Sequence, residues 1–275
     1  MKAISRALAD AARNLTTTSD TARLDAELLM AEALNIDRDR LLLSPPDRAV
    51  PKRFWTMVER RQAGEPVAYV TGRRAFWNIE LHVGPGVLIP RPDSEVLIAS
   101  ALEHFAGGTE PRCILDLGTG PGTLLLAALD LWPKVDGIGI DSSRRALSYA
   151  SANARRLGLD SRADFRLGDW AEGVSGPFDL ILCNPPYVAT GAQLGPGVAE
   201  FEPAEALFAG PEGLDDLRRL APEFPRLLAK GGLAAVEIGA DQASDAAELL
   251  AINGLQARIA EDLGGRPRAI LLTWV

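Results

Sequence analysis

The chain has few residues with which to build a disulfide network or a metal site. It contains two cysteines and two histidines among 275 residues. Cys113 and Cys183 each lie within an apolar run, which predicts two buried free thiols. His82 and His104 are far apart in the sequence and have no cysteine or carboxylate at ligand spacing, so no metal site is expected. No Ser-His-Asp or Cys-His arrangement has local support either.

Long apolar runs are also missing. A membrane-spanning helix needs about 18 apolar residues in succession, and no stretch of this sequence approaches that length. The N-terminal segment has apolar residues at helical spacing, but it lacks the continuous apolar core and the small-residue cleavage site of a secretory signal. Together with the free thiols, these absences predict a cytoplasmic protein that does not bind membranes.

Positive charge is scarce for a nucleic-acid-binding protein. Lysine and arginine total 29 against 37 acidic residues, which gives a formal net charge of -8, and no segment is dense in basic residues. Tight binding to phosphate backbones needs many Lys and Arg contacts, so nucleic acid is disfavoured as the direct substrate. An acidic surface would suit association with a basic protein partner.

Apolar residues, by contrast, are abundant enough for a full core, at 47% of the chain. The first part is helical in pattern, from Ile4 to about Gln62, and we expect a helical domain over residues 1–75. Alternating apolar residues from Phe76 to Val83, a Gly84-Pro85-Gly86 turn and the run Val87 to Ile89 predict a β-hairpin linker over residues 76–92. A second domain with a different sequence pattern should follow over residues 93–275.

This last part alternates short apolar runs with helical stretches. Such alternation predicts an α/β fold, with a largely parallel, doubly wound sheet covered by helices on both faces. The last two runs are joined by a turn with no room for a helix, so the final strand should be antiparallel. The expected strands are Cys113 to Leu117, Val135 to Ile140, Ala163 to Leu167, Phe178 to Cys183, Leu233 to Ile238, Leu255 to Ile259 and Ala269 to Trp274.

A glycine-rich loop follows the first of these strands, where open α/β sheets bind ligands. Its sequence is Asp116-Leu117-Gly118-Thr119-Gly120-Pro121-Gly122. The Gly-x-Gly-x-Gly spacing differs from the Gly-x-Gly-x-x-Gly of dinucleotide-binding loops, and a carboxylate precedes it. These features favour an aminoacyl nucleoside over a pyrophosphate, although a structural glycine turn would have the same residues.

Carboxylates also follow the next two strands. Asp141 is placed to accept hydrogen bonds from both ribose hydroxyls of a nucleoside, or it serves only the start of the next helix. After the third strand, Asp169 is placed to accept from an exocyclic amine and Trp170 to lie against an adenine ring. Surface and packing roles remain open for both residues.

The segment Asn184-Pro185-Pro186-Tyr187 follows the fourth strand and carries the most specific chemistry. The prolines fix the chain so that the Asn184 side-chain carbonyl and the Pro185 backbone carbonyl converge on one NH2 group. A planar amide or aromatic amine is a poor nucleophile, and acceptors that hold both hydrogens stabilise the pyramidal nitrogen of the transition state. Tyr187 offers a face for stacking a planar group.

Together these motifs resemble the bacterial glutamine methyltransferases that modify the Gly-Gly-Gln loop of class I peptide chain release factors. The resemblance spans nearly the whole chain. It rests on Gly64-Glu65-Pro66 with Tyr69 and Thr71-Gly72, Phe76-Trp77, Ile89-Pro90-Arg91-Pro92-Asp93-Ser94-Glu95, Asp116 to Gly122, Asp141, Gly168-Asp169-Trp170, Asn184 to Tyr187, Phe201-Glu202-Pro203, Glu237-Ile238-Gly239 and Asp262 to Arg268. Two departures are Pro121, where threonine is common, and Glu200, where a basic residue can occur; neither removes a catalytic group.

The resemblance implies a Rossmann-like class I methyltransferase domain with a seven-stranded, mostly parallel sheet, a small N-terminal helical domain that holds the release factor, and S-adenosylmethionine as cofactor. Direct methyl transfer without a metal or a covalent enzyme intermediate is expected. The candidate catalytic residues are Asn184, Pro185, Pro186 and Tyr187. The candidate cofactor-binding residues are Asp116, Gly118, Thr119, Gly120, Pro121, Gly122, Asp141, Asp169, Trp170 and Asn184.

Three alternatives remain at this point. A sister family that methylates a glutamine of a ribosomal protein shares the Asn-Pro-Pro-Tyr segment, but the Ile89 to Glu95 stretch resembles the release-factor branch more closely. Adenine-amino DNA methyltransferases share that segment as well, yet they need a pocket for a flipped base and usually a basic groove. A non-catalytic cofactor-binding scaffold would have little use for two convergent acceptors.

Overall fold

The computed structural model describes residues 2–275, which divide into two compact units. The smaller unit consists of the chain up to Arg73 together with Leu194–Glu202, and the larger unit of Arg74–Gln193 with Pro203–Val275. The smaller unit is therefore discontinuous in sequence, because it takes up a segment that follows the Asn184 loop. Nothing in the sequence pattern predicted that the segment Leu194–Glu202 would join the N-terminal helices.

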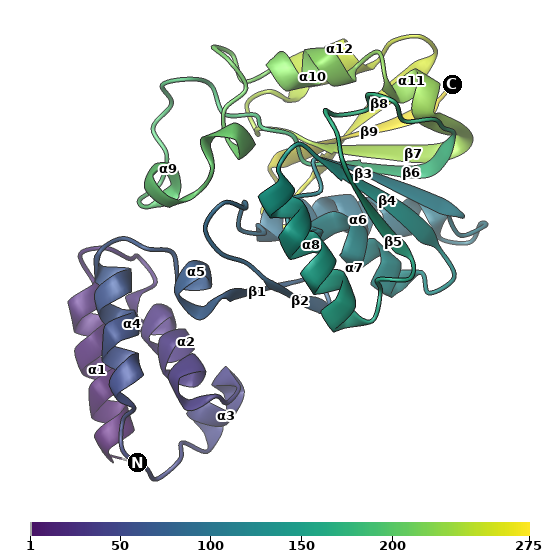
Figure 1. The fold of residues 1–275 in the computed structure, drawn as a ribbon. Coiled ribbons are helices and arrows are strands. Elements are labelled where there is room, and N and C mark those ends of the chain that lie inside the picture. The colour runs from purple at the N-terminus through teal and green to yellow at the C-terminus, as the bar shows by residue number, and fades with distance from the viewer. Residues whose placement is uncertain (1) are drawn as a thin grey trace. The chain divides into compact units, whose positions relative to one another are not determined.

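The smaller unit is helical (Figure 1). Helix α1 places Ile4, Leu8, Ala11 and Leu15 on one stripe at helical spacing, and all four are buried. This stripe packs into a core that also contains Leu29 and Phe54. The helices of the unit are α1 (Lys2–Leu15), α2 (Ala22–Leu34), α3 (Arg38–Leu43), α4 (Lys52–Gln62), α5 (Val67–Thr71) and α9 (Val198–Phe201).

A buried ion pair joins helices α2 and α4 of this unit. The Arg61 guanidinium lies 2.8 Å from the Asp25 carboxylate, with side chains that are 13% and 6% exposed. Asp25 also accepts hydrogen bonds from the hydroxyls of Ser19 (2.7 Å) and Thr21 (3.0 Å). The carboxylate is thus fully enclosed by donors, and each of them compensates part of the cost of its burial.

A two-stranded sheet follows, but not the hairpin expected from the sequence. Its strands are β1 (Arg73–Phe76) and β2 (Ile79–His82), connected by a turn at Trp77, whose φ is +52°. A turn is present at Pro85 and Gly86, within the predicted turn Gly84 to Gly86, but the strand predicted at Val87 to Ile89 does not form, and that part of the prediction is wrong. These glycines also permit close packing, since a Cβ at Gly84 would lie 2.3 Å from the Tyr149 hydroxyl.

The larger unit is built on a seven-stranded sheet of order β5-β4-β3-β6-β7-β9-β8 (Figure 1). All neighbouring strands are parallel except at β9, which is antiparallel to both β7 and β8 and confirms the prediction for the final strand. The strands are β3 (Cys113–Leu117), β4 (Asp136–Asp141), β5 (Ala163–Leu167), β6 (Phe178–Cys183), β7 (Leu228–Glu237), β8 (Leu255–Glu261) and β9 (Pro267–Trp274).

Helices cover both faces of this sheet, as the alternating pattern predicted. Helices α6, α7 and α8 lie on one face, and α10, α11 and α12 lie on the other (Figure 1). Their bounds are α6 (Glu95–Phe105), α7 (Thr123–Leu131), α8 (Arg144–Leu157), α10 (Asp215–Leu220), α11 (Phe224–Leu227) and α12 (Ala243–Leu250), with short 3-10 helices η1 (Pro92–Ser94) and η2 (Ala204–Ala206). The central strands are apolar on both sides because both faces are covered.

Both cysteines are free thiols, as predicted, although only Cys183 is fully buried and Cys113 is half-buried. Burial raises the pKa of the Cys183 thiol well above its ordinary value. Within residues 2–275, no helix is long and apolar enough to cross a membrane.

The buried pair between α2 and α4 generates a stability prediction. Arg61→Ala leaves the Asp25 carboxylate buried without its cationic partner, and we expect it to lower the free energy of unfolding by about 3 kcal/mol. The matched control is Arg13→Ala, which breaks an exposed pair with Asp10 and should cost about 0.5 kcal/mol or less. Urea unfolding of both variants measures the difference; equal effects would show that the Asp25 pair contributes no more than a surface pair.

Candidate active site

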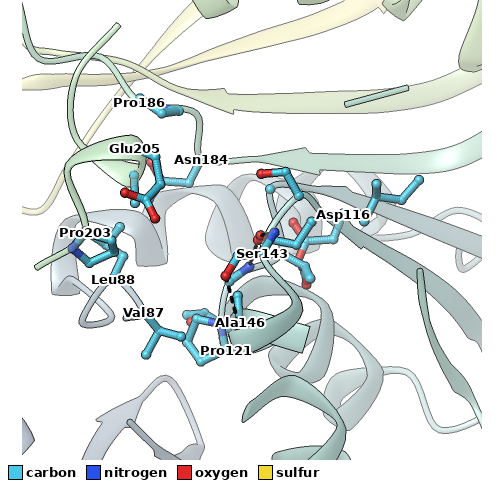
Figure 2. Close-up of a pocket in the computed structure, with 18 of the residues that line it drawn as sticks. Val87, Leu88, Asp116, Pro121, Ser143, Ala146, Asn184, Pro186, Pro203 and Glu205 are labelled. Atoms are coloured by element: carbon cyan, nitrogen blue, oxygen red, sulfur yellow. Dashed lines mark hydrogen bonds between the residues drawn. The ribbon is translucent and has the colours of Figure 1, made fainter. Parts of the chain in front are cut away.

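A cavity opens where the carboxyl ends of β3, β4 and β6 meet, on the larger unit (Figure 2). The structure brings most of the predicted site residues to its wall, although they come from four separate segments of the chain. The predicted residues that line it are Asp116, Gly118, Thr119, Gly120, Pro121, Asp141, Asp169, Trp170, Asn184 and Pro186. The predicted residues that do not line it are Gly122, Pro185 and Tyr187.

The glycine loop after β3 owes its shape to left-handed backbone at Gly118, Gly120 and Gly122. Gly120 and Gly122 differ in how closely other side chains approach them. Gly120 has open space where a Cβ would stand, whereas a Cβ at Gly122 would lie 2.7 Å from the Leu126 side chain. Gly122 therefore allows α7 to pack tightly against the loop rather than forming the cavity wall. The backbone N–H groups of Gly118 and Thr119 both donate to the Ile140 carbonyl at 2.9 Å, which ties the loop to β4.

Asp116 is a buried carboxylate with one oxygen unused. Its Oδ2 accepts from the Thr119 hydroxyl at 2.6 Å and from the Leu125 backbone N–H at 3.2 Å. Its Oδ1 is buried and has no hydrogen-bond partner within residues 2–275. Burial raises the pKa of Asp116 to about 7, against the effect of the two donors, and the charge of Asp141 raises it further. An unsatisfied acceptor in a cavity wall is a position for a ligand donor.

Asp141 combines the two roles that the sequence left open. Its Oδ2 accepts from the Gly120 backbone N–H and its Oδ1 from the Ser143 backbone N–H, both at 2.8 Å. The carboxylate therefore holds the glycine loop and the start of α8. It also lines the cavity, and a carboxylate has about four lone-pair sites, so acceptor capacity remains for ribose hydroxyls. Burial raises the pKa of Asp141, and the charge of Glu205 adds to this shift.

Asp169 and Trp170 contact a helix that the sequence did not connect with them. Asp169 forms an ion pair with Arg219 at 2.6 Å and is half-exposed. Trp170 has a φ of +50° and donates its indole N–H to Asp216 Oδ1 at 3.1 Å. Asp216 and Arg219 belong to α10 and also line the cavity. The acceptor role expected of Asp169 is thus shared with an ion pair, and Asp216 is a second acidic candidate.

Three side-chain hydrogen bonds hold the Asn184 loop in place. The Asn184 Nδ2 group donates to the Ser94 hydroxyl at 3.2 Å, and the Tyr187 hydroxyl donates to Glu237 Oε1 at 3.2 Å. The Gln242 side chain donates to the Tyr187 carbonyl at 3.0 Å. With its NH2 group engaged by Ser94, Asn184 presents its side-chain carbonyl as the free end of the amide. Stacking on Tyr187 remains a prediction, since this ring lies outside the cavity lining.

Sequence reasoning missed cavity residues that come from loops without a ligand motif. Val87 and Leu88 precede α6, and Pro203 and Glu205 follow the Asn184 loop; Figure 2 shows all four around the cavity. The Phe201-Glu202-Pro203 motif could have drawn attention to Pro203 and Glu205. It was noted only as part of the family resemblance, which did not indicate that these residues would line the cavity.

The lining favours a cationic ligand with several hydrogen-bond donors. Five acidic side chains line the cavity, namely Asp116, Asp141, Asp169, Glu205 and Asp216, against two arginines, Arg91 and Arg219. A wall with an excess of one sign concentrates ligands of the opposite sign. The unused Asp116 Oδ1 and the open backbone at Gly120 fit the ammonium, sulfonium and ribose groups of S-adenosylmethionine. Within the described part of the chain, no group of His, Cys, Asp or Glu side chains is arranged to hold a metal ion.

Two family models match the chain. The description "PrmC N-terminal domain" applies to residues 6–72 and "Methyltransferase domain" to residues 112–254. Among curated proteins, a release factor glutamine methyltransferase of Rhodospirillum rubrum is 43% identical over 90% of this chain and 78% of its own length. The protein of the same name from Moorella thermoacetica is 38% identical over 97% of this chain and 96% of its own length.

Solved structures share the fold at low sequence identity. A methyltransferase from Pyrococcus furiosus has a TM-score of 0.53 and 18% identity, over 78% of this chain and 95% of that chain. A Thermus thermophilus 16S rRNA methyltransferase, solved with S-adenosylmethionine and guanosine, has a TM-score of 0.50 and 20% identity, over 74% of this chain and 49% of that chain. The Rossmann-like class I methyltransferase fold, with its helical N-terminal region, is confirmed.

The geometry of Asp141 generates a binding prediction. Asp141→Ala removes a charged acceptor from the cavity and frees the Gly120 N–H, so we expect S-adenosylmethionine affinity to fall by about 1–3 kcal/mol. Asp141→Asn keeps the shape and one acceptor and should lose less. Calorimetric titration measures both; unchanged affinity in Asp141→Ala would mean that the carboxylate serves only the loop and the start of α8.

Proposed function

Because the chain belongs to the release factor glutamine methyltransferase family, we propose that it methylates the side-chain amide nitrogen of the glutamine in the Gly-Gly-Gln motif of class I peptide chain release factors. The protein is an S-adenosylmethionine-dependent protein-glutamine N-methyltransferase. The observation that carries the choice of an amide nitrogen is the Asn184 side chain, which is anchored through its NH2 group and lines the cavity.

The reaction needs an amide nitrogen to act as a nucleophile although its lone pair is delocalised. S-adenosylmethionine supplies an electrophilic methyl group when bound. As the nitrogen forms its bond to that methyl carbon, the carbon–sulfur bond breaks and its electron pair stays with the departing S-adenosylhomocysteine. The nitrogen becomes pyramidal and partly positive, and its two hydrogens become stronger donors. One of these protons is then lost to water, which leaves the neutral N-methyl amide. Acceptors that are fixed in place stabilise this charge more in the transition state than in the ground state.

Asn184 and Pro185 provide two such acceptors in adjacent residues. The Asn184 side-chain carbonyl is free because its NH2 group is bound by Ser94. Within residues 2–275, no group donates a hydrogen bond to the Pro185 carbonyl, and the prolines fix the backbone around it. The rest of the catalytic effect in this proposal comes from positioning the two reactants in line.

Release factor recognition is assigned in this proposal to the smaller, helical unit. None of the cavity-lining residues belongs to it. The unit exposes Leu43 at 87% and Leu42 at 42% on α3, where they are available to a protein partner. The segment Leu194–Glu202 belongs to this unit as well, so recognition and the loop after Asn184 are linked through the chain.

Labelling from S-adenosylmethionine tests the substrate class. The purified protein is incubated with labelled cofactor and, in separate reactions, with a class I release factor, large-subunit ribosomal proteins and DNA. Label on the Gly-Gly-Gln glutamine of the release factor is expected. Label on a ribosomal protein would indicate the sister activity, label on DNA an adenine-amino activity, and no label in any reaction would contradict catalysis.

The Asn184 assignment predicts a specific kinetic pattern. Asn184→Ala should slow the methyl-transfer step by about 100- to 1000-fold, since a preorganised contact to the reacting group is lost. Asn184→Asp keeps acceptor capacity and should retain more activity than alanine. Single-turnover kinetics on release factor, with cofactor affinity measured in parallel, separates chemistry from binding. A methyl-transfer rate of Asn184→Ala within a few-fold of wild type would show that this loop does not hold the amide.

The recognition role of α3 predicts an effect limited to the intact substrate. Leu43→Asp should raise KM for full-length release factor about tenfold, in line with the loss of an apolar contact, and leave the rate on a short Gly-Gly-Gln peptide unchanged. Leu263→Asp is the control, because Leu263 is fully exposed on the other unit. Equal KM values for Leu43→Asp and wild type would remove α3 from the interface.

A further inference from the structure

Two motifs with no place in the proposed chemistry meet beside the Asn184 loop. Ser94 ends η1 and directly precedes α6, and Glu237 ends β7. Ser94 is 2% exposed and Glu237 is 0% exposed. Cys183 pairs with Val236 in parallel register, so Asn184 and Glu237 follow at the same end of neighbouring strands. Glu237 lies outside the cavity lining, so a direct contact with the reactants is not its role, whereas Ser94 lines the cavity next to Asn184.

One carboxylate interacts with both ends of the Asn184 loop. The Tyr187 hydroxyl donates to Glu237 Oε1 at 3.2 Å. Ser94, which accepts from the Asn184 Nδ2 group at 3.2 Å, also interacts with Glu237 and lowers its pKa. Glu237 is thus connected to Tyr187 directly and to Asn184 through Ser94.

We propose that Glu237 and Ser94 are positioning residues that fix the orientation of the Asn184 side-chain amide, so that its carbonyl and not its NH2 group faces the substrate. The inference rests on the proposed function, since it assumes that the Asn184 carbonyl accepts from the glutamine amide. It gives a role to the Ile89 to Glu95 and Glu237 to Gly239 motifs.

The orientation of an asparagine amide needs such a device. The oxygen and nitrogen ends are nearly equal in size, so packing alone does not choose between them. With the NH2 end toward the cavity, a donor would face the donors of the substrate amide, and the stabilisation of the transition state would be lost. The choice must come from a hydrogen-bond partner of the side chain.

Ser94 makes that choice only if its single hydrogen is directed elsewhere. A hydroxyl both donates and accepts, so by itself it would bind either end of the Asn184 amide. When the hydroxyl donates to a carboxylate, its lone pairs remain and it acts as an acceptor toward Asn184. Ser94 stands at the N-cap position of α6, where serine usually caps a backbone N–H, but its side chain makes no cap bond here. Its hydroxyl is therefore available for the interactions with Asn184 and Glu237.

The ionisation of Glu237 controls this arrangement. Burial raises the pKa of Glu237 to about 7, while Ser94, the charge of Arg268 and Tyr187 act in the opposite direction and Asp93 raises it again. Arg268 is itself paired with Asp93 at 3.1 Å and lies 3.7 Å from Asp262. Protonated Glu237 would become a donor to Ser94, whose hydrogen would then turn toward Asn184. The ionised form is the one that orients the amide correctly.

Stability alone does not explain a carboxylate at this position. Since burial raises its pKa from the ordinary value of 4.5 to about 7 in the folded protein, this group lowers stability progressively as the pH rises from about 4.5 to about 7, and the full cost is present above that range. Glu237→Gln should therefore fold at pH 8 with a thermal midpoint no lower than that of wild type. A group that costs stability and contacts the reactive loop fits a functional role.

The first test compares serine variants in the full-length protein. Ser94→Ala should slow single-turnover methyl transfer to release factor by about 10- to 100-fold, the range typical of residues that orient a reactive group. Ser94→Thr keeps the hydroxyl and should recover most of the rate. Ser100→Ala removes another buried hydroxyl from α6 and serves as the control with unchanged rate. Cofactor affinity and thermal midpoint, measured in parallel, detect any loss of structure.

A double-mutant cycle separates orientation from general packing. The two oxygens of Asn184→Asp are equivalent, so this side chain has no orientation to fix. Ser94→Ala should cause little further loss in the Asn184→Asp background, although it slows the enzyme with Asn184 intact. Equal effects of Ser94→Ala in both backgrounds would overturn the positioning role and indicate packing.

The pH profile tests Glu237. The wild-type rate of methyl transfer should fall as the pH decreases through about 7, and Glu237→Gln should be slow and lack this limb. Other groups that face Glu237 are Tyr187, Arg268 and Asp93, and Asp116 titrates in the same range, so cofactor saturation is checked at each pH. A wild-type profile that persists in Glu237→Gln would contradict the inference. Absence of release factor methylation by wild type would instead contradict the proposed function on which it rests.

Discussion

The parallel pairing of β6 with β3 on one side and β7 on the other determines where each functional group ends. Leu117 pairs with Cys183, and Cys183 pairs with Val236, so the three strands stop at the same level. Directly after Leu117, Cys183 and Val236 come the glycine loop, Asn184 and the Glu237 to Gly239 motif. The cavity, the acceptor and the carboxylate beside it are therefore brought together by sheet register, and a shift of one strand would separate them.

Two carboxylates near these strand ends are buried at a cost in stability. Asp116 and Glu237 are buried carboxylates whose pKa values are raised to about 7, and each has one oxygen without a hydrogen-bond donor within residues 2–275. Asp116 lines the cavity, whereas Glu237 lies outside the lining and accepts from Tyr187 of the Asn184 loop. In the proposed function, the cost of burying a carboxylate supports cofactor binding at Asp116 and the orientation of Asn184 at Glu237.

Sequence periodicity was sufficient for the sheet but not for the segments around it. The strands were found because apolar runs alternate with helices, and the antiparallel final strand followed from the short connection before it. The hairpin was misplaced because the turn at Gly84 to Gly86 was expected to lead into a strand that does not form, and its glycines also allow close approach to Tyr149 and Arg145. The real turn at Trp77 contains no glycine, and its left-handed backbone has no clear signal in the sequence.

Some cavity residues could be predicted from the local sequence, and others depend on contacts between distant parts of the chain. Those in the glycine loop, at Asp141 and at Asn184 were predicted because strand ends identify them locally. Asp216 lies 46 residues from the Trp170 indole that it binds, and Ser94 lies 90 residues from Asn184. Such contacts depend on which helix covers which strand end, and a single sequence contains no periodic signal for that. The segment Leu194–Glu202 joined the helical unit for the same kind of reason.

Neutron diffraction from a complex with S-adenosylhomocysteine and a Gly-Gly-Gln peptide tests the central claim most directly, because deuterium positions distinguish the two ends of an asparagine amide. The account predicts that the glutamine NH2 group donates to the Asn184 side-chain carbonyl and the Pro185 carbonyl, while the Asn184 NH2 group remains bound to Ser94. An Asn184 amide turned with its NH2 group toward the peptide, or a glutamine bound away from this loop, would contradict it.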